Sequence, residues 1–504
     1  MSATETIPAR VDTRFAGGMA GTDTVDVRAL RRRLKETVEG EVRFDTQSKA
    51  MYATDASNYR QVPIGVVVPK TLDDVVATHR ACHEFGAPIV NRGGGTSLSG
   101  ETVNFAVVID HTKYLAEIGD ADAQSQTVVV QPGAINEDVN KKTGRQIGMV
   151  FGPDPSSHSR CAIGGNIGNN SCGIHSVQAQ LYGPGPRTSD NVEEMEIVTH
   201  DGARFWVGVD EEEHLDEIIA AGGRKGEIYA ALRDLRDRYA DVIREGYKPV
   251  TEVPRRVSGY NLDELLPERG FNVARALVGT ESTCATTLQV KLKLTPGLYK
   301  RTLVVVEYDE LPDAAEHCME IIEQWKPIGL EALDHRLIEN QTREGKHVSD
   351  LEELPRRDAP HSTWLLVQFG ADTAEESEGT ARRFKEWLLD KGYQENRIKI
   401  ERSQQEGGHS GDLWAVREGG LGATAFPPDG DDHWPGWEDS AVPPDRIGPY
   451  VRDLLNLYDK YADAIRAGYP DVETMPRRVS GYNLDELLPE NGFNLARALV
   501  GTES

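Results

Sequence analysis

The sequence has few cysteines and no long hydrophobic run. Its five cysteines are scattered through 504 residues and none forms a Cys-x-x-Cys pair, so they fit neither a zinc site nor an iron–sulfur ligand set. An odd number of scattered cysteines is typical of a reducing compartment. No run of eighteen apolar residues occurs, and the first 24 residues lack the apolar core of a signal peptide. We therefore expect a cytoplasmic protein with no membrane span and no metal site.

Positive charge is also scarce. The chain has 56 Lys and Arg against 82 Asp and Glu, a formal net charge of −26. Such a surface repels the phosphates of nucleic acids and of anionic membranes, so neither is an expected partner. The hydrophobic fraction of 38% is that of a globular protein, and the length leaves room for about three domains.

Glycine is concentrated in two segments, 91–100 and 151–173. In the first, Gly93-Gly94-Gly95 precedes Thr96 and Ser97 and lies between two apolar, strand-like runs. Backbone amides in such a loop can approach phosphate oxygens without obstruction by side chains. The two segments together predict the two walls of a dinucleotide site.

The order of periodic segments predicts two kinds of domain. A helix is expected from Asp26, and residues 65–110 read as a β-α-β unit with Thr71 as the helix N-cap. Further elements follow, and the sequence assigns them as strands at 126–130, 194–199 and 203–207, a helical insertion at 210–254, and core strands within 272–294. A separate domain is predicted from strands at 302–307 and 363–368, helices at 312–325 and 374–389, and a loop at 426–444.

The chain contains one internal repeat. Residues 239–282 recur as 461–504 with about four residues in five identical. The first copy continues into strand-like residues, and the second ends at Ser504. We interpret residues 455–504, the duplicate of 233–282, as a recombination or gene-end artefact. The alternative is a genuine second module.

Five motifs occur in one order: Arg92 to Gly100, Pro153-Asp154-Pro155, Ile163 to Asn170, Gly259-Tyr260-Asn261-Leu262, and Leu277 to Glu281. In this order they resemble the FAD-linked oxidases, which are vanillyl-alcohol-oxidase-like flavoproteins with a PCMH-type FAD-binding domain. Within them the chain is most similar to the group of D-lactate dehydrogenase, glycolate oxidase and D-2-hydroxyglutarate dehydrogenase. It looks closest to the branch that normally continues into an iron–sulfur domain, which is absent here.

The resemblance implies an α+β fold and a division of the chain. An N-terminal extension and helix (1–42) precede a two-lobed FAD-binding domain (43–298), followed by a ferredoxin-like substrate or cap domain (299–454). It also implies a set of FAD ligands. These are Arg92, Gly93, Gly94, Gly95, Thr96, Ser97, Gly100, Pro153, Asp154, Gly164, Gly165, Asn169, Asn170, Gly173, Gly279 and Glu281.

Two of these positions carry a specific expectation. A side chain at Gly94 is expected to occupy the place of the phosphate. Beyond Glu281, Ser282 stands where the family has a glycine, which puts in doubt a contact that needs bare backbone.

In the second domain, Trp414-Ala415-Val416-Arg417-Glu418 resembles the family's Trp-x-x-Arg-Glu motif. The resemblance assigns Arg417 to the substrate carboxylate, which a guanidinium can bind with two parallel hydrogen bonds. An ion pair with Glu418 or Asp412 is the alternative. The lysine of the 2-hydroxyglutarate enzymes is not matched, which counts against a substrate with two carboxylates. The family's His-x-Gly-Asp-Gly-x-x-His segment is also unmatched, and His409 and His433 are expected to be solvated loop residues.

The resemblance implies FAD-dependent oxidation of a D-lactate-like 2-hydroxy acid to a 2-keto acid by hydride transfer to the flavin. Because the histidine segment is missing, activity is expected to be impaired, and a non-catalytic flavin-binding remnant is the alternative. An alditol or amine oxidase is a third possibility. A quinone, a cytochrome or a separate iron–sulfur protein is the expected electron acceptor. The sequence does not choose among these acceptors or among hydroxy acids.

Overall fold

The computed structural model describes residues 11–12, 24–209, 211–257, 259–346, 351–352, 354–357, 362–402, 410–420 and 442–468. The chain forms two compact units, Met1–Gly297 and Leu298–Ser504, each described here by itself. Three predicted features lie outside the described residues: His409, the part of the loop at 426–441 with His433, and the repeat from 469 onward.

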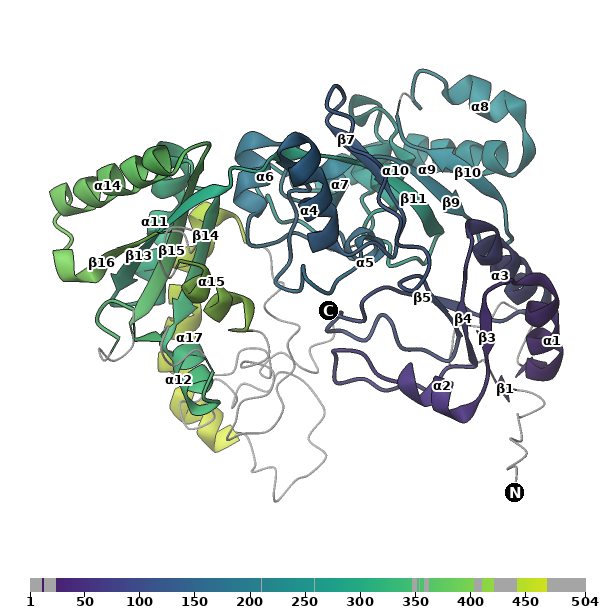
Figure 1. The fold of residues 1–504 in the computed structure, drawn as a ribbon, viewed down its shortest axis with the longest axis horizontal. Coiled ribbons are helices and arrows are strands. Elements are labelled where there is room, and N and C mark those ends of the chain that lie inside the picture. Colours follow the sequence, from purple (N-terminus) through teal and green to yellow (C-terminus); the bar gives the residue numbers. More distant parts are fainter. Residues whose placement is uncertain are drawn as a thin grey trace. The chain divides into compact units, whose positions relative to one another are not determined.

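The first unit contains a four-stranded sheet in the order β3-β4-β6-β5 (Figure 1). Its strands are β3 (Glu41–Arg43), β4 (Gly65–Val68), β5 (Ile89–Arg92) and β6 (Val107–Asp110). β4, β6 and β5 are parallel, and α3 (Leu72–Phe85) connects β4 to β5. This confirms the predicted β-α-β unit, which places the glycine loop at the carboxyl end of β5.

Helix starts in this unit follow the sequence signals. Thr71 and Asp74 form a capping box at the start of α3. The Asp26 side chain accepts a hydrogen bond from the Ala29 amide at the start of α1 (Val27–Thr37). α1 buries Val27, Leu30 and Leu34 in one cluster with residues of α3 and the sheet. Three further short elements are β1 (Val11–Asp12) and β2 (Thr24–Val25), which pair with each other, and the helix α2 (Thr46–Met51).

A second, antiparallel sheet in the same unit has the order β10-β9-β11-β7. Its strands are β7 (Thr127–Val130), β9 (Val192–Val198), β10 (Arg204–Val207) and β11 (Thr286–Lys293). Around it lie α4 (Asn136–Ile147), α5 (Ile163–Gly168), α6 (Ser176–Tyr182), α7 (Thr188–Asn191), α8 (Leu215–Ala221), α9 (Gly223–Gly246) and α10 (Val273–Leu277). β8 (Met149–Val150) pairs with β12 (Thr295–Pro296). The two sheets are the two lobes that the sequence predicts.

The expectation of strands throughout 272–294 is wrong for its first part. Residues 273–277 form α10, because the Asn272 side chain caps the helix by accepting from the Arg275 amide at 2.8 Å. Alanine, arginine and leucine then favour the helix. Only Thr286–Lys293 is a strand, and its side chains alternate between buried and half-buried.

The second unit contains an antiparallel sheet in the order β14-β15-β13-β16. Its strands are β13 (Lys300–Tyr308), β14 (Gly329–Asp334), β15 (Thr363–Ala371) and β16 (Ile398–Glu401). α11 (Leu311–Trp325) connects β13 to β14, and α14 (Ala374–Asp390) connects β15 to β16. This double strand-helix-strand arrangement is ferredoxin-like, as predicted. The described part of this unit also contains α12 (His335–Arg343), α15 (Ser410–Glu418) and α17 (Ile447–Gly468).

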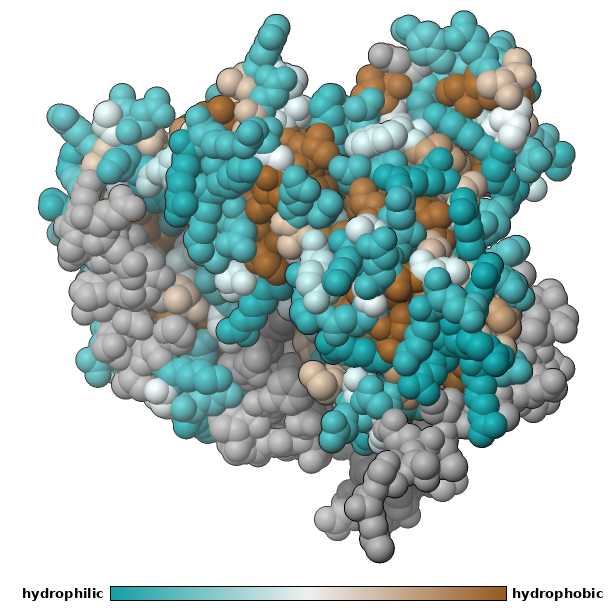
Figure 2. All heavy atoms as spheres, turned by 45° about the vertical axis from the view of Figure 1, so that its right-hand side comes forward, coloured by the Kyte–Doolittle hydropathy of each residue, from teal (hydrophilic) through white to brown (hydrophobic). Residues whose placement is uncertain are grey.

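On the face drawn in Figure 2, hydrophilic residues predominate among the coloured atoms, with hydrophobic residues visible between them, which accords with the many charged residues of the sequence. Over the described ranges, no helix combines the length and the apolar character that a membrane crossing requires.

Candidate functional site

A cleft in the first unit lies where the glycine loop after β5 faces α5 and the segment before β11. Six of the predicted FAD ligands line it: Arg92, Gly93, Gly164, Gly165, Asn169 and Glu281. Residues that the sequence did not single out also line it, among them Asn91, Glu101, Thr102, His111, Thr286 and Thr287. Asn91, Glu101 and Thr102 flank the glycine loop, whereas His111, Thr286 and Thr287 come from other elements, which no local motif could reveal.

Bare backbone faces the cleft at α5. A Cβ atom built on Gly165 meets no other atom within 4 Å, and one on Gly168 meets only the Glu281 Cα, at 3.8 Å. Both glycines line the cleft. A planar ring or a ribityl chain can therefore approach this helix closely.

Gly94 is closed in by backbone. A Cβ atom there meets the Arg160 carbonyl oxygen at 2.2 Å, so the structure leaves no room for a side chain at this position. Gly94 does not line the cleft. The glycine is required because the loop packs directly against residues 160–161.

The rest of the glycine loop is held by its own side chains. Gly95 has φ +66°, and a Cβ atom there meets Arg92 Nη2 at 2.7 Å. The Ser97 hydroxyl donates to the Glu101 carboxylate and accepts from Asn169 Nδ2 at 3.4 Å. Thr96 lies between Gly95 and Ser97 in this loop. Gly100 has φ +83° and packs on the Tyr59 ring. Ser97 thus links the two predicted walls, although it does not itself line the cleft.

Three other predicted ligands, Pro153, Asp154 and Gly173, do not line the cleft and are held by neighbouring residues. The Pro153 carbonyl accepts from Asn136 Nδ2 at 2.9 Å. The Asp154 carboxylate accepts from the His175 amide at 2.9 Å and lies 2.5 Å from His175 Nδ1. A Cβ atom on Gly173 meets the Asp154 carbonyl carbon at 2.1 Å, so only glycine fits there. The Pro-Asp-Pro turn is therefore a packed support.

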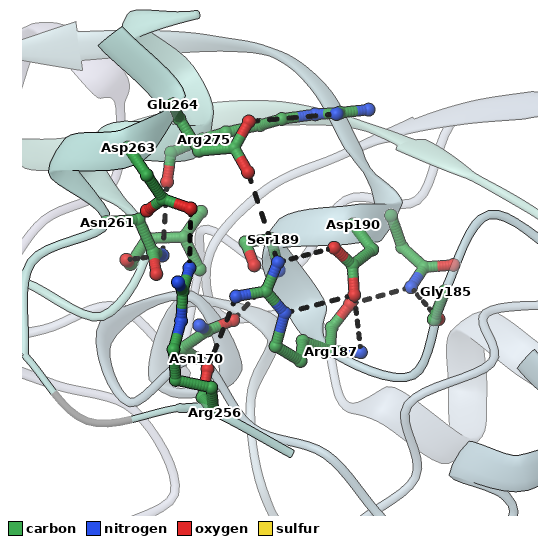
Figure 3. Close-up of polar contacts among 12 residues, drawn as sticks. Asn170, Gly185, Arg187, Ser189, Asp190, Arg256, Asn261, Asp263, Glu264 and Arg275 are labelled. Carbon is green, nitrogen blue, oxygen red and sulfur yellow. Dashed lines mark hydrogen bonds and ion pairs between the residues drawn. The ribbon is translucent and has the colours of Figure 1, made fainter. Parts of the chain in front are cut away.

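Asn170 belongs to a buried polar cluster (Figure 3), and Gly279 packs against it. Asn170 has φ +49°, and its Oδ1 accepts from the Ser189 amide at 2.9 Å. Gly279, with φ +88°, brings its backbone so close that an added Cβ meets Asn170 Cβ at 3.2 Å. These two residues thus brace the segment that follows α5 against the turn before β11.

Arg187 is the centre of this cluster and is fully buried. Its guanidinium donates to both carboxylate oxygens of Asp190, at 3.1 and 2.7 Å, and to the Arg256 carbonyl at 3.2 Å (Figure 3). Glu264 Oε1 lies 3.9 Å from Arg187 Nη2. The Gly259–Leu262 motif of the sequence borders this cluster, where Asn261 Nδ2 donates to the Val278 carbonyl at 2.8 Å.

The cleft carries charge of both signs. Arg92 Nη2 donates to the Thr54 carbonyl at 2.9 Å and the guanidinium lies over the Tyr52 ring. Its buried Nη1 has no hydrogen-bond partner in the part of the chain that the structure describes. Burial raises the pKa of the Glu281 carboxyl, and the nearby Glu101 carboxylate raises it further. An unpartnered cationic donor and an open glycine backbone in one cleft fit an anionic dinucleotide such as FAD.

Arg417 lies in the second unit, on α15. Its Nε donates to Glu331 Oε2 on β14 at 2.9 Å. The Arg417 side chain is 32% exposed and that of Glu331 is 8% exposed. The guanidinium is thus oriented by a buried carboxylate and remains partly accessible.

Two domain families match the sequence. The FAD binding domain matches residues 63–208, and the C-terminal domain of FAD linked oxidases matches residues 299–472. The first match contains the glycine loop and α5, and the second contains the ferredoxin-like unit and Arg417. The matched domains indicate FAD as the cofactor.

Curated relatives include D-2-hydroxyglutarate dehydrogenase of Pseudomonas putida, 26% identical over 84% of this chain and 41% of that protein. The glycolate oxidase subunit GlcD of Escherichia coli is 32% identical over 37% of this chain and 36% of its own length. D-lactate dehydrogenase of Archaeoglobus fulgidus is 24% identical over 66% of this chain and 59% of its own. The chain spans about two fifths of the length of the D-2-hydroxyglutarate dehydrogenases that it matches.

A solved structure of alkyldihydroxyacetonephosphate synthase is similar in fold. The TM-score is 0.53 at 14% identity, covering 79% of this chain and 64% of that one. This likeness supports the two-lobed fold that the sequence predicts. The chain thus carries, in this order, an FAD binding domain and the C-terminal domain of FAD linked oxidases.

Proposed function

We propose that this protein uses FAD to oxidise a small 2-hydroxy acid to the corresponding 2-keto acid. The observation that carries the proposal is the glycine-lined cleft in a chain that also bears the C-terminal domain of FAD linked oxidases. The names of the relatives, which include dehydrogenases of D-lactate and D-2-hydroxyglutarate, support a hydroxy acid as substrate. When bound, FAD supplies the acceptor for the hydride.

The residues that hold the cofactor in this proposal are those that line the cleft. Arg92 Nη1 offers a charged donor to a phosphate oxygen. The Gly165 and Gly168 backbone offers a flat surface for the flavin or its ribityl chain. The remaining predicted ligands act by holding these elements in place.

In the same proposal, Arg417 binds the substrate carboxylate. Glu331 holds Nε, and in this proposal the two terminal nitrogens of the guanidinium form a bidentate pair with the substrate. The sequence has no match to the lysine of the 2-hydroxyglutarate enzymes, so we favour a substrate with one carboxylate, such as D-lactate. The electron acceptor in this proposal is a quinone, a cytochrome or an iron–sulfur protein.

A flavin-binding protein without turnover is the second candidate. It is favoured by the lack of a His-x-Gly-Asp-Gly-x-x-His segment in the 504 residues. Loss of a general base slows a reaction by roughly a hundred- to ten-thousandfold.

An anaerobic absorption spectrum tests both candidates. The purified protein is loaded with FAD, and D-lactate or D-2-hydroxyglutarate is added. Bleaching by D-lactate supports the proposed oxidation, and preferential bleaching by D-2-hydroxyglutarate would overturn the choice of a monocarboxylate. A stable flavin spectrum with both acids would support the second candidate. Failure to take up FAD would overturn both.

A further inference from the structure

A chain of four polar side chains runs through the floor of the cleft. His111, which directly follows β6, has its Nε2 2.9 Å from Asn91 Oδ1. Asn91 Nδ2, on β5, donates to Thr286 Oγ1 at 2.7 Å. Thr286 Oγ1, at the start of β11, lies 2.9 Å from Nε2 of His79 on α3. The chain thus connects the two sheets of the first unit, and three of its members line the cleft.

The Asn91 amide turns its oxygen toward His111 and its nitrogen toward Thr286, to which Nδ2 donates. An amide oxygen can only accept, so in this arrangement His111 Nε2 carries hydrogen. In a neutral imidazole with hydrogen on Nε2, Nδ1 is an acceptor.

His111 is 4% exposed, and its Nδ1 has no hydrogen-bond partner among the described residues. Burial lowers the pKa of the His111 imidazole to about 4, so the ring is neutral at pH 7. A buried acceptor without a donor costs about 1–3 kcal/mol. A hydrogen-bond donor on a ligand in the cleft would remove this cost.

We propose that His111 binds the FAD of the proposed function by accepting, at Nδ1, a hydrogen bond from an N–H or hydroxyl group of the dinucleotide. Asn91 and Thr286 are positioning residues in this proposal, because they select the tautomer that leaves Nδ1 free. The inference rests on FAD binding in this cleft. It adds an imidazole to a site for which the sequence predicted no histidine.

Two parts of FAD carry suitable donors. The flavin imide and the ribityl hydroxyls lie at one end, and the ribose hydroxyls and the adenine amino group lie at the other. Riboflavin carries only the first set and ADP only the second. Perturbation of His111 by one of these two fragments therefore identifies the half of the cofactor that it contacts.

The matched variants are H111Q and H111N in the full chain. A glutamine amide reaches the position of Nε2 and can still donate to Asn91, but it leaves nothing at Nδ1. We expect H111Q to bind FAD about tenfold more weakly, the value of one buried hydrogen bond. H111N places an amide oxygen near the position of Nδ1, and a smaller loss is expected. H83Q, at an exposed position near the end of α3, is the control and should bind FAD as the wild type does.

Nitrogen NMR of histidine-labelled protein provides a readout that a structural role would not move. H111Q identifies the His111 signals. In the FAD-free protein they should show hydrogen on Nε2, and FAD should shift the Nδ1 signal. T286V, which removes the acceptor for Asn91, should populate the tautomer with hydrogen on Nδ1 and weaken FAD binding.

Two results would overturn this inference while the proposed function survives. They are FAD binding that leaves the Nδ1 signal unmoved, and wild-type affinity in H111Q. A wild-type protein that takes up no FAD would instead overturn the proposed function, and this inference with it.

Discussion

Arg417 Nε and Glu331 Oε2 are 2.9 Å apart in the second unit, on α15 and β14. Only 8% of the Glu331 side chain is exposed. Glu331 is buried and Arg417 is partly exposed, so the carboxylate orients the guanidinium but does not bury it. A residue placed this way suits the recognition of a second carboxylate from solution.

We expect R417A to raise the D-lactate concentration that half-saturates flavin bleaching by about 10- to 100-fold, since charged hydrogen bonds contribute about 1.5–3 kcal/mol. The control is R382A, which removes an exposed arginine paired with Glu378 at 3.2 Å on α14 of the same unit. It should leave this concentration unchanged. An unaltered value in R417A would remove Arg417 from the substrate site.

Backbone strain before β11 gives a second prediction. Glu281 and Ser282 have φ +50° and +60°, two successive non-glycine residues in the left-handed region. This conformation costs non-glycine residues about 1–2 kcal/mol each, which accounts for the family's glycine at position 282. S282G should therefore stabilise the protein by about 0.5–1 kcal/mol after the entropy of glycine is subtracted.

Urea denaturation of the FAD-free protein measures this gain. C284G, at a neighbouring exposed position whose φ is not positive, is the control and should destabilise. A loss of stability in S282G would mean that the serine side chain contributes more than the strain costs.

The two glycine walls differ in what a methyl group would meet, and this gives a third prediction. G165A adds a Cβ atom that meets nothing within 4 Å in the protein and extends into the cleft. The fold should tolerate it, and FAD affinity should fall by at least about tenfold because the close approach is lost. Gly246, at the end of α9, also has open space around an added Cβ atom. G246A should therefore be tolerated by the fold and should leave FAD affinity unchanged.

G94A should behave in the opposite way to G165A. Its Cβ atom would lie 2.2 Å from the Arg160 carbonyl oxygen, so the loop must move and the thermal midpoint should drop. Melting curves and FAD titrations of both variants separate the two roles. If G165A melts early and G94A does not, the assignment of the two walls is reversed.

Local signals in the sequence predicted much of the fold. Caps such as Asp26 and Thr71 and the alternating or apolar runs placed most helices and strands. The alternating apolar residues from 272 favour a strand, but the Asn272 cap favours the helix α10, which is what forms. The floor of the cleft depends on contacts such as Asn91 with Thr286, which lie 195 residues apart and leave no local pattern.

The buried cluster around Arg187 gives a prediction about pH. Glu264 is 3% exposed, and its Oε2 has no hydrogen-bond partner among the described residues. Burial raises the pKa of this carboxyl against the opposing effect of Arg275 and Arg187. An acid whose pKa is raised on folding contributes stability that is present below its unfolded pKa and is lost as the pH rises through its folded pKa.

E264Q removes the ionisable group and with it the cost of a buried carboxylate at high pH. At pH 7.5 the variant should therefore be more stable than the wild type by about 1 kcal/mol. Near pH 4, where the carboxyl is protonated, this gain should vanish. E268Q has the opposite sign, because Arg244 lowers the pKa of Glu268 to about 2 and any contribution of the exposed pair is present only above the unfolded pKa. Urea denaturation of the wild type and both variants at the two pH values measures these differences in the free energy of unfolding. If E264Q is less stable at pH 7.5, the ionised carboxylate is needed to compensate Arg187, and the raised pKa does not describe the folded protein.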